Sequence, residues 1–230
     1  ADMETPIRVF QNFYGEKRAF LLESVEGGLK WARYSFIGTD PFMMITAKNG
    51  LTKVEIGGEI KEYNKPPIEV LKAHLRAFLS PPLPDLPRFT GGAVGFFGYD
   101  LLRYYENLPK HRSDDLAMND IQFMFCDQVI AFDHFKQQIK VIANVHIPER
   151  STDDEIRQAY REACDKIERM IARLRAGGPS FEVSPSEIPP DVDIGEIRSN
   201  VTREQFINNV EKAREYIRAG DIFQVVLSQR

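Results

Sequence analysis

The dipeptide Asn49-Gly50 constrains the fold of this chain more than any other feature of the sequence. It separates two runs rich in apolar residues, FMMITAK at 42–48 and LTKVEIG at 51–57. An Asn-Gly pair favours the tight two-residue turn of an antiparallel hairpin, because both residues adopt positive φ at little cost. The sequence therefore predicts a β-hairpin here, and with it an antiparallel sheet.

Further strand-like runs lie on both sides of this hairpin. RAFLLES at 18–24 and ARYSFIG at 32–38 are expected to pair with each other, and EIKEYN at 59–64 adds a short strand. The apolar stretch at 121–145 predicts two long strands that turn near 134–137. This strand-rich order indicates an α+β fold, with mostly antiparallel sheets in a sandwich-like arrangement flanked by helices.

Three helices are predicted from apolar periodicity and from their caps: one at 68–79, one at 152–175 and one within 201–220. The last two each begin with a capping box, and Gly220 suits the end of the third helix. The capping residues are Thr152 with Glu155, and Thr202 with Gln205. The apolar stripe expected on the second helix consists of Ile156, Tyr160, Ala163, Ile167, Ile171 and Leu174.

Between the last two helices the composition shifts toward proline and glycine, which is typical of a linker or a long surface crossing. The sequence thus suggests a domain at 1–178, a linker at 179–200 and the beginning of another domain at 201–230. Residues 222–227 form an apolar run that predicts a buried strand. A strand needs a partner and none follows it, so we expect the chain to be part of a longer one.

Composition and charge exclude several classes of function. The formal net charge is -4, which argues against nucleic acid and anionic membranes as partners. No apolar run approaches the roughly 20 residues that span a membrane, and ADMETPIRVF at the N-terminus is no signal peptide. Two cysteines in a chain of 230 residues make no disulfide framework. We therefore expect reduced thiols and a cytoplasmic location.

Two kinds of site are disfavoured by spacing. The histidines are scattered without metal-ligand spacing, so they are interpreted as surface or strand-end residues and no metal site is expected. The glycine-rich stretch GGAVGFFGYD at 91–100 invites a nucleotide-binding interpretation, but it lacks the G-x-G-x-x-G order and no P-loop Lys follows. Aromatic residues between its glycines favour a strand packed tightly against other backbone.

An amino-acid site is suggested where LLES at 21–24 ends a strand. If the strands at 18–24 and 32–38 pair, Glu23, Ser24 and Arg33 can lie together over an apolar floor. A carboxylate beside a hydroxyl can hold an ammonium group, and an arginine can hold a carboxylate. The alternative, which these residues alone favour, is an exposed hairpin with a surface ion pair.

Four separated motifs together identify a resemblance that extends from about Thr5 to Arg230. They are LLESVEGG, RYSFIG, GGAVGFFGYD and, most specifically, AGDIFQVVLSQR at 219–230. In this order they resemble component I of anthranilate synthase, among the chorismate-utilising enzymes. The related aminodeoxychorismate synthases more often carry Asn where Val226 stands, so the run QVVL favours the anthranilate synthase form.

The resemblance implies an activity, a cofactor and partners. The family converts chorismate to anthranilate and pyruvate with Mg²⁺, using ammonia from a glutamine amidotransferase partner, component II. L-tryptophan, the end product of the pathway, inhibits by binding a separate site. The resemblance places that site at Leu22, Glu23, Ser24, Trp31, Ala32, Arg33 and Tyr34. The magnesium carboxylates and acid/base groups belong to a C-terminal half that this sequence lacks.

The resemblance also places the last segment of the sequence. Residues 201–230 would be the first helix and strand of the chorismate-binding domain, and only Gln224 matches a substrate-binding position. The chain alone is therefore expected to be inactive. Two alternatives stay open: component I of aminodeoxychorismate synthase, and a non-catalytic module that binds an amino acid.

Overall fold

The Asn49-Gly50 turn joins two antiparallel strands, as the sequence predicts. In the computed structural model, β3 (Met43–Lys48) and β4 (Leu51–Ile56) pair from Met43↔Ile56 to Lys48↔Leu51. Both turn residues have positive φ, 50° for Asn49 and 91° for Gly50. The structure describes residues 4–23, 33–108, 114, 116–178 and 198–229. Contacts divide the chain into two units, Ala1–Ser180 and Phe181–Arg230.

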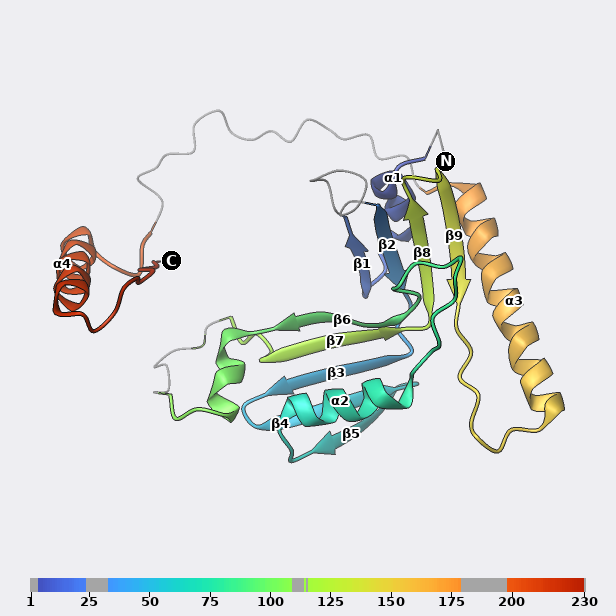
Figure 1. Ribbon diagram of the computed structural model, residues 1–230, viewed down its shortest axis with the longest axis horizontal. Coiled ribbons are helices and arrows are strands. Elements are labelled where there is room, and N and C mark those ends of the chain that lie inside the picture. Colours follow the sequence, from blue (N-terminus) through green and yellow to red (C-terminus); the bar gives the residue numbers. More distant parts are fainter. Residues whose placement is uncertain (1–3, 24–32, 109–113, 115, 179–197, 230) are drawn as a thin grey trace. The chain divides into compact units, whose positions relative to one another are not determined.

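The hairpin belongs to a five-stranded antiparallel sheet with the order β5-β4-β3-β7-β6. Its other strands are β5 (Glu59–Tyr63), β6 (Gly92–Phe97) and β7 (Ile121–Cys126). Helix α2 (Pro67–Ala77) covers one face (Figure 1). The core between them consists of Met43, Ile45, Ala47, Val54, Val70, Leu71, Ile121, Phe123 and Phe125.

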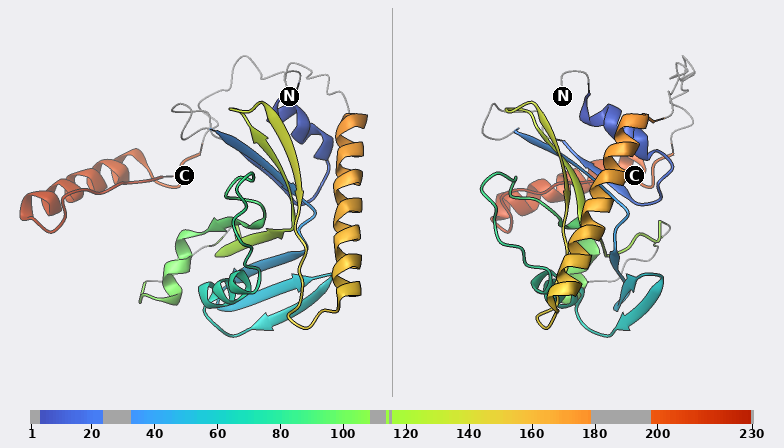
Figure 2. Two further views of the ribbon diagram at one scale, coloured as in Figure 1. Left: turned by 45° about the vertical axis from the view of Figure 1, so that its right-hand side comes forward. Right: turned by 90° about the vertical axis from the view of Figure 1, so that its right-hand side faces the viewer.

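A second antiparallel sheet has four strands in the order β1-β2-β8-β9. The strands are β1 (Ala19–Leu22), β2 (Tyr34–Thr39), β8 (Gln128–Asp133) and β9 (Gln138–Ala143). Three helical segments pack on this sheet, α1 (Pro6–Phe10), η1 (Gln11–Phe13) and α3 (Asp153–Ala176), with α3 running along β9 (Figure 2). Their core consists of Val9, Phe13, Ile37, Ile130, Phe132 and Met170. Two antiparallel sheets flanked by helices confirm the α+β class.

The predicted pair of long strands at 121–145 is wrong in one respect, because the structure has three strands there. The apolar run breaks at Asp127, so that β7 lies in the five-stranded sheet and β8 in the four-stranded sheet. The carbonyl oxygen of Asp127 accepts from the amide of Asn144 at 2.7 Å. Its carboxylate binds Nζ of Lys166, on α3, at 2.6 Å. These contacts turn the chain from one sheet to the other, and apolar periodicity carries no signal for them.

Helix α3 begins as predicted, but its buried stripe differs. Oγ1 of Thr152 accepts from the amide of Glu155 at 3.3 Å, and the Glu155 carboxylate accepts from the amide of Thr152 at 2.7 Å. The buried side chains are Ala163 and Met170, whereas Tyr160 is 67% exposed. The part of α3 that is buried against the sheet is therefore narrower than the apolar stripe predicted from the sequence.

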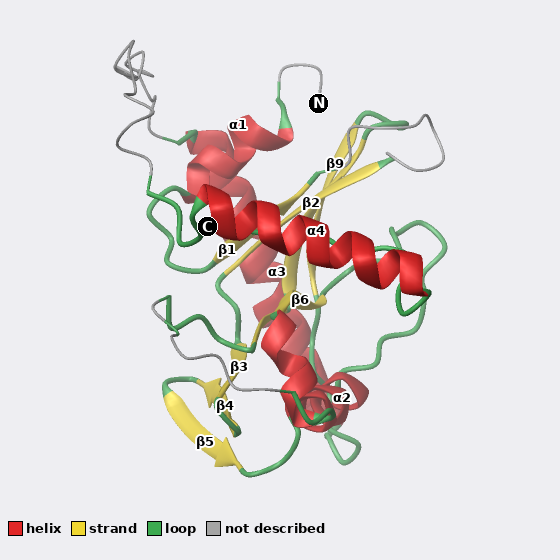
Figure 3. Ribbon diagram, turned by 90° about the vertical axis from the view of Figure 1, so that its left-hand side faces the viewer, coloured by secondary structure: helices red, strands yellow, loops and turns green. Residues whose placement is uncertain are grey.

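The second unit contains α4 (Arg203–Ala219), with the predicted capping box and with Gly220 in the left-handed conformation at φ 81°. The predicted strand at 222–227 does not form, and the segment after α4 is a loop (Figure 3). Phe223 is 93% exposed and Val226 is 81% exposed. The physical reason is that a strand exists only through hydrogen bonds to a neighbour, and no described segment supplies them. Among the described helices, none is long and apolar enough to cross a membrane.

Candidate functional site

The candidate amino-acid site begins with an aromatic face at the ends of β1 and β2. Leu22 and Phe36 are direct cross-strand partners, so their side chains share one face of the sheet. Tyr34 lies on the same face and its ring stacks on that of Phe36, with 5.9 Å between centroids. Phe89 meets Phe36 edge-on at 5.2 Å. Because Leu22 is 43% exposed, this apolar face is open to solvent.

A glycine allows this face to pack. A Cβ atom at Gly38 would lie 2.2 Å from Cε1 of Phe20, so the Phe20 ring occupies the space that any side chain at 38 would need. Gly38 and Phe20 are cross-strand partners between β2 and β1. The absent side chain at Gly38 thus lets the Phe20 ring lie flat on β2 and reach Phe89, at 6.3 Å between centroids.

Arg33 enters an ion pair that sequence reasoning missed. Its Nε donates to Oδ1 of Asp133 at 3.0 Å and its Nη2 to Oδ2 at 2.7 Å. Asp133 is 1% exposed and also accepts from the backbone amides of Phe135 and Lys136. The hydrogen bond from Arg33 lowers the pKa of Asp133 to about 2, against the opposing effect of burial. Asp133 ends the apolar run VIAFD. A carboxylate at the end of an apolar strand is the sequence feature that could have pointed to this ion pair.

This ion pair limits what Arg33 can do for a ligand. Two of its five N–H donors are taken by Asp133, so three remain, and the guanidinium lies over the Tyr34 ring at 4.8 Å. The Asp133 carboxylate also offsets its charge, which weakens attraction for a ligand carboxylate. Glu23 is exposed just after β1. The other expected site residues, Ser24, Trp31 and Ala32, lie outside the described residues.

Ser35 and His134 form a pair that looks like a nucleophile with its base. Oγ of Ser35 lies 2.8 Å from Nε2 of His134. Ser35, however, is completely buried, so no substrate can approach its hydroxyl. The backbone amide of His134 also donates to the carbonyl oxygen of Arg33 at 2.9 Å. The pair therefore fixes the turn after β8 against β2.

The glycines of β6 lie against neighbouring backbone. A Cβ atom at Gly95 would lie 1.9 Å from the carbonyl oxygen of Gln122 and 2.7 Å from Cα of Phe123. One at Gly91, just before β6, would lie 2.5 Å from the side-chain Nδ2 of Asn144 and 3.0 Å from the carbonyl oxygen of Cys126. The distances at Gly95 confirm a strand in close backbone contact for Gly92–Phe97, whereas the end of the predicted stretch, Tyr99 and Asp100, begins a 3-10 helix.

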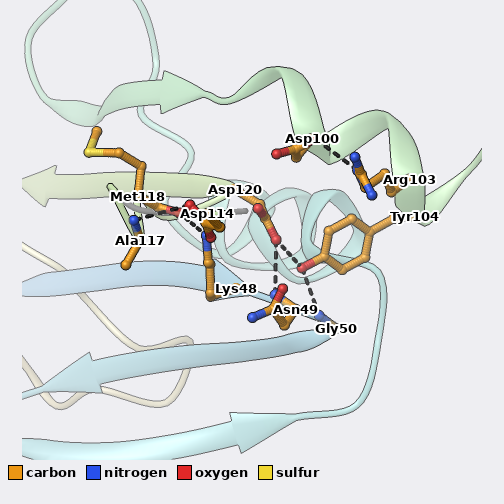
Figure 4. A network of polar contacts seen from close by, with 10 residues as sticks. All are labelled: Lys48, Asn49, Gly50, Asp100, Arg103, Tyr104, Asp114, Ala117, Met118 and Asp120. Atoms are coloured by element: carbon orange, nitrogen blue, oxygen red, sulfur yellow. Dashed lines mark hydrogen bonds and ion pairs between the residues drawn. The ribbon is translucent and has the colours of Figure 1, made fainter. Parts of the chain in front are cut away.

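A buried carboxylate and a tyrosine hold the Asn49-Gly50 turn (Figure 4). Oδ2 of Asp120 accepts from the amide of Asn49 at 3.0 Å and from the hydroxyl of Tyr104 at 2.8 Å. The same hydroxyl accepts from the amide of Gly50 at 2.9 Å. Burial raises the pKa of Tyr104 to about 12, so the phenol is neutral at physiological pH. Tyr104 belongs to η2 (Tyr99–Tyr104), and the turn is thus tied to a segment far away in the sequence.

Neither a thiol nor a metal centre emerges from the described side chains. Cys126 is buried and its thiol pKa is raised to about 12 by that burial, which makes it unreactive. In the described ranges, no group of three or more His, Cys, Asp or Glu side chains could hold a metal ion. Gln224, the expected substrate contact, is exposed in the loop that follows α4.

Comparison with known proteins assigns the family. The chain matches the family described as chorismate binding enzyme over residues 17–230. The chain belongs to this chorismate binding enzyme family. Among its relatives, anthranilate synthase component 1 of Acetivibrio thermocellus is 44% identical, and that of Geobacillus stearothermophilus is 37% identical. Each alignment covers all of this chain and 46% of the relative, so this family member spans about half the length of its relatives.

A solved structure gives the same result for the fold. The crystal structure of anthranilate synthase component I from Streptococcus pneumoniae TIGR4 superposes with a TM-score of 0.65 at 28% sequence identity. The match covers all of this chain and 47% of that one. The two antiparallel sheets with their helices are therefore a fold that this chorismate binding enzyme family already contains.

Proposed function

We propose that this chain is the N-terminal portion of an anthranilate synthase component I. The observation that carries the proposal is the set of relatives with that name, which align with the whole chain at up to 44% identity. In the proposed reaction, ammonia adds to the ring of chorismate and the ring hydroxyl leaves as water. Pyruvate is then eliminated, which leaves anthranilate and makes the enzyme a lyase. A glutamine amidotransferase, component II, would supply the ammonia. The proposed setting is tryptophan biosynthesis in the cytoplasm.

Within this proposal, the described residues supply no catalytic centre. They contain no carboxylate cluster fit for Mg²⁺, so we assign the magnesium site to the part of the relatives' length that this chain does not span. We therefore assign no catalytic role to the residues of this chain. The proposed domains are a regulatory domain at 1–178, a linker at 179–200 and the beginning of the chorismate-binding domain at 201–230. Gln224 is its proposed substrate contact.

The regulatory ligand in this proposal is L-tryptophan. The aromatic face of Leu22, Tyr34 and Phe36 supports an indole-sized apolar ligand, because aromatic rings pair favourably by stacking or edge contacts. In this proposal Glu23, exposed just after β1, would attract the ligand ammonium, and the remaining donors of Arg33 would bind its carboxylate. Ser24, Trp31 and Ala32 would complete the site. Binding there would inhibit the distant chorismate site, which is feedback by an allosteric effector.

The test is product identification with two proteins. One is this chain alone, and the other is this chain joined to the remainder of the Acetivibrio thermocellus relative. Each receives chorismate, Mg²⁺ and ammonium, and anthranilate is followed by its fluorescence. We expect anthranilate from the joined protein only. Tryptophan should inhibit this activity, and a joined protein in which Ser24 is replaced should no longer be inhibited. Glutamine with component II should replace ammonium.

Other products would decide between the alternatives. Accumulation of aminodeoxychorismate, which keeps its pyruvyl ether, would make the chain part of aminodeoxychorismate synthase. Clear anthranilate formation by the isolated chain would contradict the assignment of the catalytic groups to another part. Tryptophan binding by a folded joined protein that forms neither product would favour a non-catalytic amino-acid-binding module.

A further inference from the structure

Asn49-Gly50 is a chemically vulnerable dipeptide as well as a turn. In Asn-Gly sequences the backbone nitrogen of glycine can attack the side-chain carbonyl carbon of asparagine, because glycine has no side chain to hinder ring closure. Here the bond from the Gly50 nitrogen to Cγ of Asn49 would form, and the Cγ–Nδ2 bond would break. The amide leaves as ammonia and takes up the proton that the Gly50 nitrogen loses. Water then opens the succinimide at either carbonyl and returns a proton to nitrogen, giving aspartate or isoaspartate.

This reaction requires a free Gly50 amide and a turn that can rearrange. In the structure the Gly50 amide donates to Oη of Tyr104 at 2.9 Å, and Tyr104 in turn donates to Asp120 at 2.8 Å. A neutral phenol that already donates to a carboxylate cannot take the Gly50 proton. Asp120 is only 7% exposed and also binds the amide of Asn49. Both amides of the dipeptide are therefore held by the same tyrosine–carboxylate pair.

The flanking residues restrain the turn further. Nζ of Lys48 binds the carboxylate of Asp114 and the carbonyl oxygen of Met118, and Lys48 is the cross-strand partner of Leu51. Asn49 itself is exposed. Water can thus reach the reactive side chain, and the limit on the reaction is the restrained backbone.

We propose that Asn49 is a deamidation site whose reaction is held back by the hydrogen bonds of Tyr104 and Asp120. The consequence of losing that restraint is structural. Isoaspartate inserts an extra carbon into the main chain of a two-residue turn, and the new carboxylate lies close to that of Asp120. Because the turn leads out of β3, which pairs with both β4 and β7, the modification would weaken the five-stranded sheet at its centre.

The test compares the native chain with Y104F, which keeps the ring and removes the hydroxyl. Y105F is the matched control, since Tyr105 is the next residue and is 49% exposed. The three chains are incubated at mildly alkaline pH, and aspartate and isoaspartate at position 49 are quantified by peptide mass mapping. Y104F removes both hydrogen bonds of this hydroxyl, but only the one from the Gly50 amide restrains the attacking nitrogen. We therefore expect deamidation in Y104F to be about fivefold faster, the effect of losing that one bond. Y105F should match the native chain.

A second comparison needs no variant. The native chain should deamidate at Asn49 at least about tenfold more slowly than the same chain unfolded in urea, because the reaction must await local opening. The proposal is overturned if the folded and unfolded chains react at the same rate. It is equally overturned if Y104F, shown to be folded by circular dichroism, reacts no faster than the native chain.

Discussion

Arg33 and Asp133 lie one hundred positions apart in the sequence and form a two-pronged ion pair at 3.0 Å and 2.7 Å. The pair joins the start of β2 to the end of β8, where Tyr34 and Asp133 are cross-strand partners. Asp133 is almost completely buried, while the Arg33 side chain is 34% exposed. The buried Asp133 therefore fixes the pair within the sheet, and the partly exposed Arg33 lies at the edge of the candidate amino-acid site.

Replacing Asp133 by Asn should destabilise the chain by about 2 kcal/mol, the usual worth of hydrogen bonds to a buried charged group. The matched control is E62Q, which removes the surface ion pair of Glu62 with Lys53. That pair is about half exposed at both ends, so its loss should change stability by less than about 0.5 kcal/mol. Urea unfolding of both variants measures the difference. Equal effects would mean that the buried pair contributes no more than a surface pair.

The same carboxylate should make stability depend on acid. The folded state holds the pKa of Asp133 at about 2, below its ordinary value of 3.8. The folded state thus binds this proton less readily than the unfolded state. Its contribution to stability is complete above the ordinary pKa and is lost as the pH falls toward about 2. Urea midpoints at about pH 5 and about pH 2.5 should therefore differ less in D133N than in the native chain, and identical differences would contradict the assignment.

Alanine at Gly95 should be the more damaging of two glycine replacements. The new Cβ would meet the backbone of Gln122 and Phe123, which cannot move without breaking the β6–β7 ladder. We expect a loss above about 3 kcal/mol. At Gly38 the obstacle is the ring of Phe20, which can shift, so G38A should cost about 1–3 kcal/mol. Thermal unfolding of the two variants gives the order, and a milder effect for G95A would contradict the packing argument.

Tryptophan inhibition should depend on Tyr34 if the proposed regulatory site is correct. Y34A removes the ring that stacks on Phe36 and lies under Arg33. In the joined protein, the tryptophan concentration for half-inhibition should rise about fivefold to tenfold, the effect of one lost aromatic contact. The control is Y160A, because Tyr160 is exposed on α3 away from this face. Unchanged inhibition in an active Y34A protein would place the ligand elsewhere.

Local signals in the sequence were sufficient for much of the secondary structure. Asn49-Gly50 specified its hairpin because the turn needs positive φ at both positions. Thr152 and Thr202 specified where two helices begin, because a capping side chain acts within one turn of its own helix. In each case the residue that determines the turn or the helix start lies within a few positions of it, so the sequence alone is sufficient for the prediction.

Features that depend on distant partners were missed. Asp127 divides an apolar run between two sheets through contacts with Asn144 and Lys166, and no local pattern reveals them. Asp133 stands just before the predicted turn at 134–137, and its role as the partner of Arg33 depends on β2 pairing with β8. The aromatic face behind Leu22 likewise requires Phe89, which comes from a separate loop. The run at 222–227 has strand composition but finds no partner strand among the described residues.

The passage of the chain from β7 to β8 at Asp127 also sets an order of events during synthesis. Residues 121–126 complete contacts with β3, and residues 128–133 complete contacts with β2. Strands β1 and β2 leave the ribosome early but must wait for this segment before their sheet can close, which is a slow, long-range step. The hairpin at Asn49-Gly50 can form at once, since the pairing of β3 with β4 is local. Both sheets therefore wait for one continuous stretch of newly made chain, and the four-stranded sheet is complete once β9 follows it.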